Sequence, residues 1–225
     1  MLTGVPRRLN LAALTDDELQ RLVGPDRAVT LLPDLSLARL EGRAVPGPTV
    51  TETLTPQPLE DRAWGATPEQ ARAIGALHQD LLGVGAATRG TLYLPGISEV
   101  RHVRAYVLEP DVSAALRWSE TPDDPAHGWP FVQLISWLRD RASGFACVLT
   151  SSARTPYAPA LSEEIDVHLH PDCPPLDLLS AHRAHVLRHG RAQKVQPDAD
   201  WVRPWQAMHA LNLTAWDRRG LLLPE

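Results

Sequence analysis

Apolar and polar positions alternate with a period of two along the middle of the chain. Between residues 111 and 119, Val112, Ala114, Leu116 and Trp118 alternate with polar residues, and residues 100–108 repeat the pattern. Such alternation is typical of half-buried β-strands, and the Glu109-Pro110 break between the two runs indicates a hairpin. We therefore predict a strand over 111–119 whose Val112, Leu116 and Trp118 side chains face the core.

Further strand patterns surround this hairpin. Residues 131–138 and 145–150 form a second pair around a polar, glycine-containing turn, while 91–94 and 163–168 are shorter runs. Hairpin connections of this length join antiparallel neighbours. The middle of the chain is therefore predicted to be an antiparallel β-meander of four to five strands.

Helix signals flank the meander on both sides. Thr15 and Glu18 have the spacing of a capping box for a helix over 16–23, and Thr67 with Gln70 has the same spacing for a helix over 68–82. Two further helices are predicted from Pro175 to Gly190 and from about Pro204 onward, since proline favours a first helical turn. Because a half-polar sheet needs cover on one face, we expect the 68–82 helix and the two C-terminal helices to pack on it. The expected fold class is α+β.

The first part of the chain is divided by prolines. Six prolines fall between residues 25 and 58, which predicts short elements only, with strands at 29–32 and 36–40 and an extended linker at 45–61. We therefore divide the chain into a proline-rich arm over 1–66, with one short helix and possible strands, and a main α+β domain over 67–225.

Composition narrows the class of protein. The chain has 225 residues, 44% hydrophobic and 22% charged, with a net charge of −5, which gives no overall electrostatic attraction to nucleic acid. It has no apolar run of membrane-spanning length and no secretion signal pattern, and its two cysteines, Cys147 and Cys173, are too few for a disulfide framework. We expect a cytoplasmic protein with no membrane segment.

Histidines gather in one region. Five of the nine lie between residues 168 and 189, and those at 182, 185 and 189 have the spacing of one helical stripe. Imidazole and thiolate groups bind zinc and other divalent transition metals, so the tentative ligands would be His168, His170, His182, His185 and Cys173. The same stripe contains Leu179 and Val186, so we favour packed histidines over a metal site.

Two other regions offer binding chemistry. Ser151, Ser152 and Arg154 follow a strand and form a tentative anion site, although such residues are also common in turns. Near the C-terminus, tryptophans lie close to basic residues, a combination that suits a single-stranded nucleic acid but also a protein core or interface. The residues concerned are Trp201, Trp205, Trp216, Arg191, Lys194, Arg203, Arg218 and Arg219.

Four segments together resemble a loosely defined group of uncharacterised bacterial α+β domains. These are Arg104 to Leu108, Phe131 to Asp140, the turn from Thr150 to Pro156, and the Leu179-x-x-His182-Arg183-x-x-Val186 helix. The resemblance covers roughly residues 103–191. It implies a meander followed by a helix and no assigned activity.

No motif in the chain fixes a reaction. We expect a non-enzymatic binding or interaction protein that acts with a protein partner or as a dimer, because tryptophan is abundant and proline-rich flanks suit docking. One alternative is a metal-dependent enzyme that uses the cluster from His168 to His189. The other is a nucleic-acid-binding protein that uses the C-terminal tryptophans and arginines.

Overall fold

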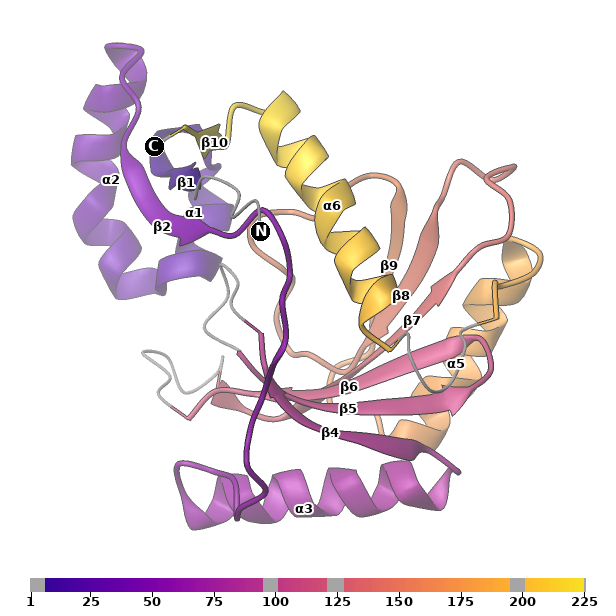
Figure 1. Cartoon of the computed structure of the whole chain (residues 1–225). Coiled ribbons are helices and arrows are strands. Elements are labelled where there is room, and N and C mark those ends of the chain that lie inside the picture. The colour runs from indigo at the N-terminus through magenta and orange to yellow at the C-terminus, as the bar shows by residue number, and fades with distance from the viewer. Residues whose placement is uncertain (1–6, 95–100, 121–127, 195–200, 225) are drawn as a thin grey trace.

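A computed structural model describes residues 7–94, 101–120, 128–194 and 201–224. The described chain is a mixed α and β structure with two sheets and five α-helices (Figure 1). None of the helices in this part of the chain is long and apolar enough to cross a membrane. In chain order the elements are β1 (Arg7–Asn10), the 3-10 helix η1 (Leu11–Ala13), α1 (Asp16–Val23), α2 (Pro25–Leu40), β2 (Pro46–Val50), β3 (Gln57–Pro58), α3 (Pro68–Gly83), β4 (Ala87–Tyr93), β5 (His102–Glu109), β6 (Val112–Trp118), β7 (Phe131–Trp137), β8 (Cys147–Ser151), β9 (Ile165–Leu169), α5 (Pro175–Arg188), α6 (Val202–Arg218) and β10 (Leu222–Leu223).

The main sheet has seven strands in the order β3-β4-β5-β6-β7-β8-β9. Pairs from β3 to β8 are antiparallel, whereas β8 and β9 run parallel. The predicted four- to five-stranded antiparallel meander is therefore wrong in size and in its last pairing. The long connection over residues 152–164 explains the parallel pair, because it returns the chain to the start of β8 as no tight hairpin can.

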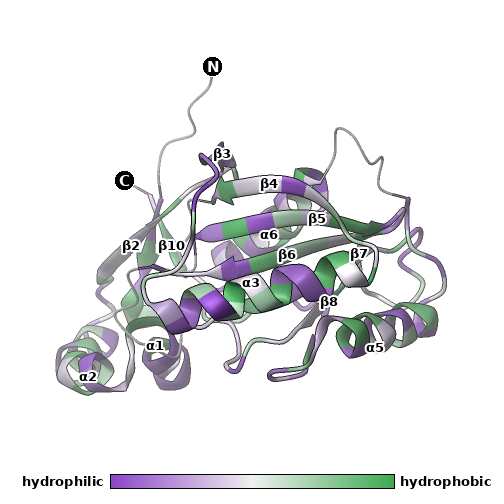
Figure 2. Ribbon diagram, turned by 90° about the horizontal axis from the view of Figure 1, so that it is seen from below, coloured by the Kyte–Doolittle hydropathy of each residue, from purple (hydrophilic) through white to green (hydrophobic). Residues whose placement is uncertain are grey.

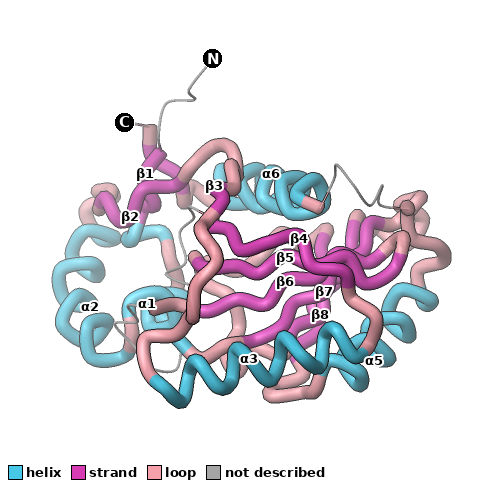
Figure 3. The backbone as a smooth tube through the Cα atoms, turned by 60° about the horizontal axis from the view of Figure 1, so that its bottom comes forward, coloured by secondary structure: helices cyan, strands magenta, loops and turns pink. Residues whose placement is uncertain are grey.

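Helices cover both faces of this sheet. Helices α3 and α5 lie on one face and α6 on the other (Figures 1 and 3). Residues of β6 alternate between two cores: Leu116 and Trp118 pack with α3 and α5, and Ala115 packs with α6. Trp118 has no exposed surface, so the prediction that Val112, Leu116 and Trp118 face the core is confirmed.

Helix starts follow the local signals closely. Thr15 and Glu18 form the complete capping box that their spacing predicts at the start of α1. Thr67 caps α3 through the Gln70 amide, but the Gln70 side chain accepts from Ala66 and donates to the carbonyls of Ser119 and Gly128. Gln70 therefore fastens α3 to the end of β6 as well as capping the helix.

The strands predicted at 29–32 and 36–40 are wrong, because both segments belong to α2. This helix continues through Pro33, although a proline inside a helix removes one hydrogen bond and costs roughly 3 kcal/mol. The compensation is tertiary: Ala28 and Leu35 are buried, and Leu31 and Leu32 pack against the same core. Figure 2 shows apolar (green) and hydrophilic (purple) positions along α2. Burial of this apolar side of α2 therefore outweighs the cost of Pro33.

The N-terminal segment packs against the C-terminal end of the chain. Strand β1 pairs with β10 on one side and with β2 on the other, so the predicted linker at 45–61 contains strand β2 and also β3. Leu9, Leu19 and Leu35 share one core with Trp216 and Leu221. The division of the chain at residue 66 stays a prediction.

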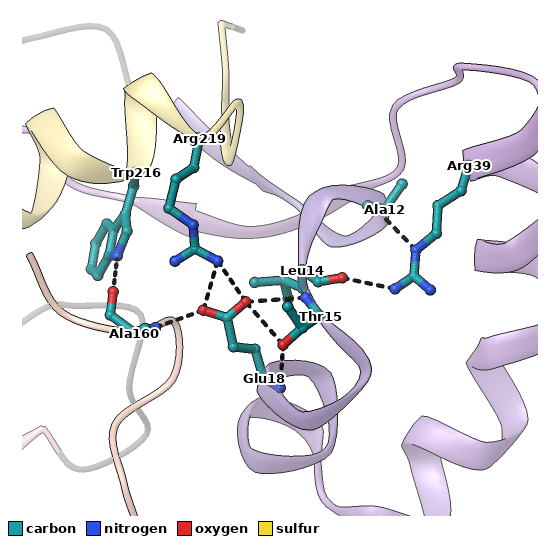
Figure 4. Close-up of polar contacts among 8 residues, drawn as sticks. All are labelled: Ala12, Leu14, Thr15, Glu18, Arg39, Ala160, Trp216 and Arg219. Carbon is teal, nitrogen blue, oxygen red and sulfur yellow. Dashed lines mark hydrogen bonds and ion pairs between the residues drawn. The ribbon is translucent and has the colours of Figure 1, made fainter.

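Glu18 connects three distant segments (Figure 4). Its carboxylate accepts from Arg219 at 2.7 and 2.8 Å, from the Ala160 amide at 2.8 Å and from Thr15. Glu18 is 4% exposed. Burial by itself would raise the pKa of Glu18, but the hydrogen bonds from Arg219, Ala160 and Thr15 outweigh it and hold the pKa at about 2.

We expect Glu18→Ala to lower the free energy of unfolding by about 3 kcal/mol at pH 7, because Arg219 and the Ala160 amide lose a buried anionic partner. In the wild type the Glu18 carboxylate has a pKa below its unfolded value. Its contribution is therefore present at neutral pH and lost as the pH falls from about 4.5 to about 2. Urea unfolding at several pH values measures both effects.

The matched control is Glu163→Ala, since Glu163 pairs with Arg218 but both side chains are exposed. This variant should match the wild type within error. An equal loss of stability in the two variants would contradict the role assigned to Glu18.

Candidate functional site

The structure brings the five clustered histidines together between α5 and the edge strand β9. His168 and His170 lie two residues apart on β9 and just after it, and His182 and His185 lie on α5, which His189 follows as its C-cap. The rings of His168 and His185 stack with centroids 3.5 Å apart. Parallel pairing with β8 produces this arrangement, because it sets His168 beside Thr150 on the face that α5 covers.

Asp166 organises one half of the cluster. Its Oδ2 atom lies 2.7 Å from Nε2 of His168 and 2.7 Å from Nε2 of His189. Burial would raise the pKa of Asp166, but the hydrogen bonds from the two histidines lower it. A charged carboxylate can only accept, so both histidines donate through Nε2.

His182 is completely buried and has a protein partner for each ring nitrogen. Its Nε2 lies 2.9 Å from the Ser136 hydroxyl and its Nδ1 lies 2.9 Å from the Thr150 hydroxyl. Ser136 donates its own proton to the Asp111 carbonyl, so it accepts from Nε2–H, and Thr150 donates to Nδ1. Burial, with smaller contributions from His185 and His168, lowers the pKa of His182 to about 3.

His185 links α5 to the end of β9. Arg188 donates to its Nδ1, and its Nε2 lies 3.1 Å from Nε2 of His170. Because the arginine can only donate, the neutral ring carries its proton on Nε2 and donates to His170. Burial first, and then the charges of His168 and Arg188, lower the pKa of His185 to about 4.

The tentative metal ligands do not converge on one point in the described part of the chain. Both nitrogens of His182 are engaged by hydroxyls, and the Cys173 sulfur faces the Pro174 carbonyl at 3.7 Å. Nε2 of His170 and Nε2 of His185 lie 3.1 Å apart, which is a pair of nitrogens and not a full coordination set. In the described part of the chain no group of three or more His, Cys, Asp or Glu side chains is arranged to hold a metal.

The polar groups of the tentative anion site already have partners within the protein. Ser151 and Ser152 are 0% and 5% exposed, and their hydroxyls accept from the amides of Ala153 and Val132. Arg154 forms an ion pair with Asp172. These groups stabilise the turn after β8, and their role in anion binding stays a prediction.

The C-terminal tryptophans belong to the interior. Trp201, Trp205 and Trp216 are at most 6% exposed, and the indoles of the first and last donate to backbone carbonyls. Arg218 and Arg219 pair with Glu163 and Glu18. These three rings therefore have no exposed face on which bases could stack.

A polar cavity that the sequence did not reveal lies between α3 and the strands β4 and β5. It has a volume of about 300 Å³, and its lining is mostly polar. The lining residues are Leu59, Asp61, His78, Thr88, Gly90, Thr91 and Arg104. In the sequence, His78 has the helical spacing of Ile74 and Leu81, and no motif marks it as a binding residue.

A β-bulge shapes this cavity. The register between β4 and β5 shifts between Thr88 and Thr91, and Gly90 adopts a φ of +95° that favours glycine. Bulges occur often beside functional sites, where they redirect side chains. The glycine among threonines and arginine in β4 was the signal available in the sequence.

A hydrogen-bonded chain of three side chains connects α3 to the sheet. Nδ1 of His78 lies 2.7 Å from the hydroxyl of Tyr106, which has no exposed surface and also hydrogen-bonds Arg104. Burial raises the pKa of Tyr106, so the hydroxyl keeps its proton. Burial and the charge of Arg104 lower the pKa of His78. The protonated Tyr106 hydroxyl can donate to Nδ1, and in that tautomer a neutral His78 carries its proton on Nε2.

Comparison with protein-family models, with curated proteins and with solved structures gave no match to this chain. The resemblance to uncharacterised bacterial α+β domains therefore stays a prediction.

We expect His182→Ala to lower the free energy of unfolding by about 3 kcal/mol, because it empties a buried site and leaves the hydroxyls of Ser136 and Thr150 without their partner. Metal content, measured by elemental analysis on protein purified without an affinity tag, should stay at background. His170→Ala, at a half-buried position, should cost less stability. Near-stoichiometric metal that both variants abolish would contradict the packing role.

Stability should also fall as the pH decreases from about 6.5 to 4. The pKa values of His182 and His185 are about 3 and 4 in the folded protein and near 6.5 when unfolded. Protons therefore bind the unfolded chain first in this window, which favours unfolding. Urea unfolding at pH 7.5, 6 and 5 measures the slope, and His185→Gln should reduce it. Equal stability at pH 7.5 and 5 would show that the two rings are not held neutral.

Proposed function

We propose that the protein is a non-enzymatic binding protein and that the cavity beside His78 holds a small polar ligand. The observation that carries this proposal is the convergence of polar groups from three elements, α3, β4 and β5, around one open cavity. The volume of about 300 Å³ lies at the lower end of ligand-binding pockets and suits a small molecule.

The chemistry of the lining favours recognition over catalysis. Thr88 and Thr91 offer hydroxyls, Arg104 offers a guanidinium, and neutral His78 offers a ring N–H. Tyr106, behind them, has a raised pKa and a proton already directed to His78, so it serves as a positioning group and is a poor general base. Fixed donors of this kind orient a ligand.

The histidine cluster gives weaker support to a metal-dependent enzyme. Its nitrogens are mostly engaged by Asp166, by hydroxyls or by each other, and none of its residues lines the cavity beside His78. Association with a protein partner or with a second copy, and a cytoplasmic location, stay predictions from the sequence.

A thermal-shift panel tests the proposal, with polyols and sugars, amines, amino acids, carboxylates and phosphate esters as probes. A ligand at 100 times its Kd adds about 2.7 kcal/mol of stability. For a chain of this size that corresponds to a rise in Tm of roughly 5 to 10 °C. We expect at least one class of compound to produce such a rise.

A second test fills the cavity by the substitution Thr88→Trp. Thr88 lines the cavity and belongs to β4, and tryptophan is well tolerated in β-strands. The matched control is Thr214→Trp, which adds the same ring at an exposed position of α6. The shift should disappear in the first variant and persist in the second. The proposal fails if no compound shifts the wild type, or if Thr88→Trp responds like the wild type.

A further inference from the structure

We propose that the ligand of the His78 cavity is a small organic anion, bound through its carboxylate or phosphate group to Arg104. This inference rests on the proposed function and specifies the chemistry of the same site. Its basis is that the positive charge of Arg104 is half-buried and that Thr91 and Tyr106 hydrogen-bond its side chain.

Arg104 is a half-buried cation without a carboxylate partner in the described part of the chain. Its Nε donates to the Thr91 hydroxyl at 3.4 Å, and the guanidinium hydrogen-bonds Tyr106, but it forms no ion pair with a described acidic residue. Taking a cation partly out of water is costly unless an anion compensates. Arg62, by contrast, pairs with Glu120.

The contacts of Arg104 leave its donors available on the cavity side. A guanidinium carries five N–H groups in a planar fork that matches the two oxygens of a carboxylate or phosphate. Thr91 and Tyr106 are both buried and lie on the sheet, so they anchor the arginine from that side. The cavity that Arg104 lines is open to solvent, where an anion can approach.

His78 supplies a second donor for the same group. Its Nδ1 is occupied by the Tyr106 hydroxyl, which leaves Nε2–H on a ring that lines the same cavity as Arg104. Arginine, tyrosine and histidine are thereby held in one hydrogen-bonded chain across α3 and β5. Such a chain fixes both donors before the ligand arrives, which reduces the entropy cost of binding.

The remaining lining groups of the cavity limit the rest of the ligand. Asp61 and the hydroxyls of Thr88 and Thr91 line the cavity, and the Asp61 carboxylate acts on His78 by its charge. A second anionic group would be repelled by Asp61, whereas hydroxyl or ammonium groups would bind there. The structure therefore favours a compound with one anionic end and hydrogen-bond donors at the other end.

Matched pairs of compounds test the charge requirement on the wild-type protein by calorimetry. Glycerol 3-phosphate is compared with glycerol, and lactate with propane-1,2-diol. A separate comparison of inorganic phosphate with acetate, both anions, distinguishes phosphate from carboxylate. At least one anion should bind ten times more tightly, or better, than its neutral counterpart. Neutral compounds that bind as tightly as the anions would overturn the inference.

Three substitutions test the assigned donors. Arg104→Gln should weaken the bound anion roughly 10- to 100-fold, because a charge-assisted hydrogen-bond pair is lost. Arg104→Lys keeps the charge but not the fork and should lie between this variant and the wild type. His78→Phe should weaken binding about 2- to 10-fold. Arg43→Gln, an exposed arginine of the N-terminal segment, is the control and should bind like the wild type.

The failures of the two proposals are distinguishable. If only neutral or cationic compounds bind, and Thr88→Trp abolishes that binding, the cavity is a ligand site and the anion inference is wrong. If nothing binds, or binding survives in Thr88→Trp, the proposed function fails together with the inference. The wild-type comparison needs no variant, so it decides the charge requirement even if Arg104→Gln does not fold.

Discussion

The buried carboxylate of Glu18 is the contact on which the arrangement of the chain most depends. It joins α1, the connection between β8 and β9, and the end of α6 through Ala160 and Arg219. The same connection is held by Trp216 and Asn212 of α6. Since this connection returns the chain to the start of β8, it determines that β9 runs parallel to β8. The charge of Glu18 is tolerated in the interior because every segment that meets there donates to it.

The parallel strand decides the chemistry of the histidine cluster. It turns Asp166 and His168 towards α5, where they meet the stripe of His182, His185 and His189. Packing so many imidazoles would leave several nitrogens unsatisfied unless they bonded one another or other polar groups. Asp166, Ser136 and Thr150 provide those partners. Most nitrogens of the cluster are therefore hydrogen-bonded to protein groups, as in a packed polar interior, and His170 and His185 form an imidazole pair.

The cavity beside His78 lies next to α3, which packs on the same face of the main sheet as α5. Its polar groups come from α3, from the bulged strand β4 and from β5, and none of them is close to the others along the chain except those on β4. The bulge bends the strand, and the buried Tyr106 holds α3 and Arg104 in fixed positions. A rigid scaffold with donors held in advance is what a small binding site requires.

Local rules were sufficient for the capped helices α1 and α3 and for strands such as β6, because a cap or an alternating pattern involves only nearby residues. The residues of the histidine cluster, and the fact that His168 and His170 share a side, were also readable from spacing. Long-range contacts decided the rest. Packing of Ala28 and Leu35 outweighed the cost of Pro33 in α2. The long connection before β9 made this strand parallel to β8, where an antiparallel strand was expected. His78 and Arg104, which are far apart in the sequence, line one cavity only because α3 packs on the sheet. Local preferences amount to a few kcal/mol at most, whereas burial of a whole helix face or strand contributes more, so tertiary structure prevails where the two conflict.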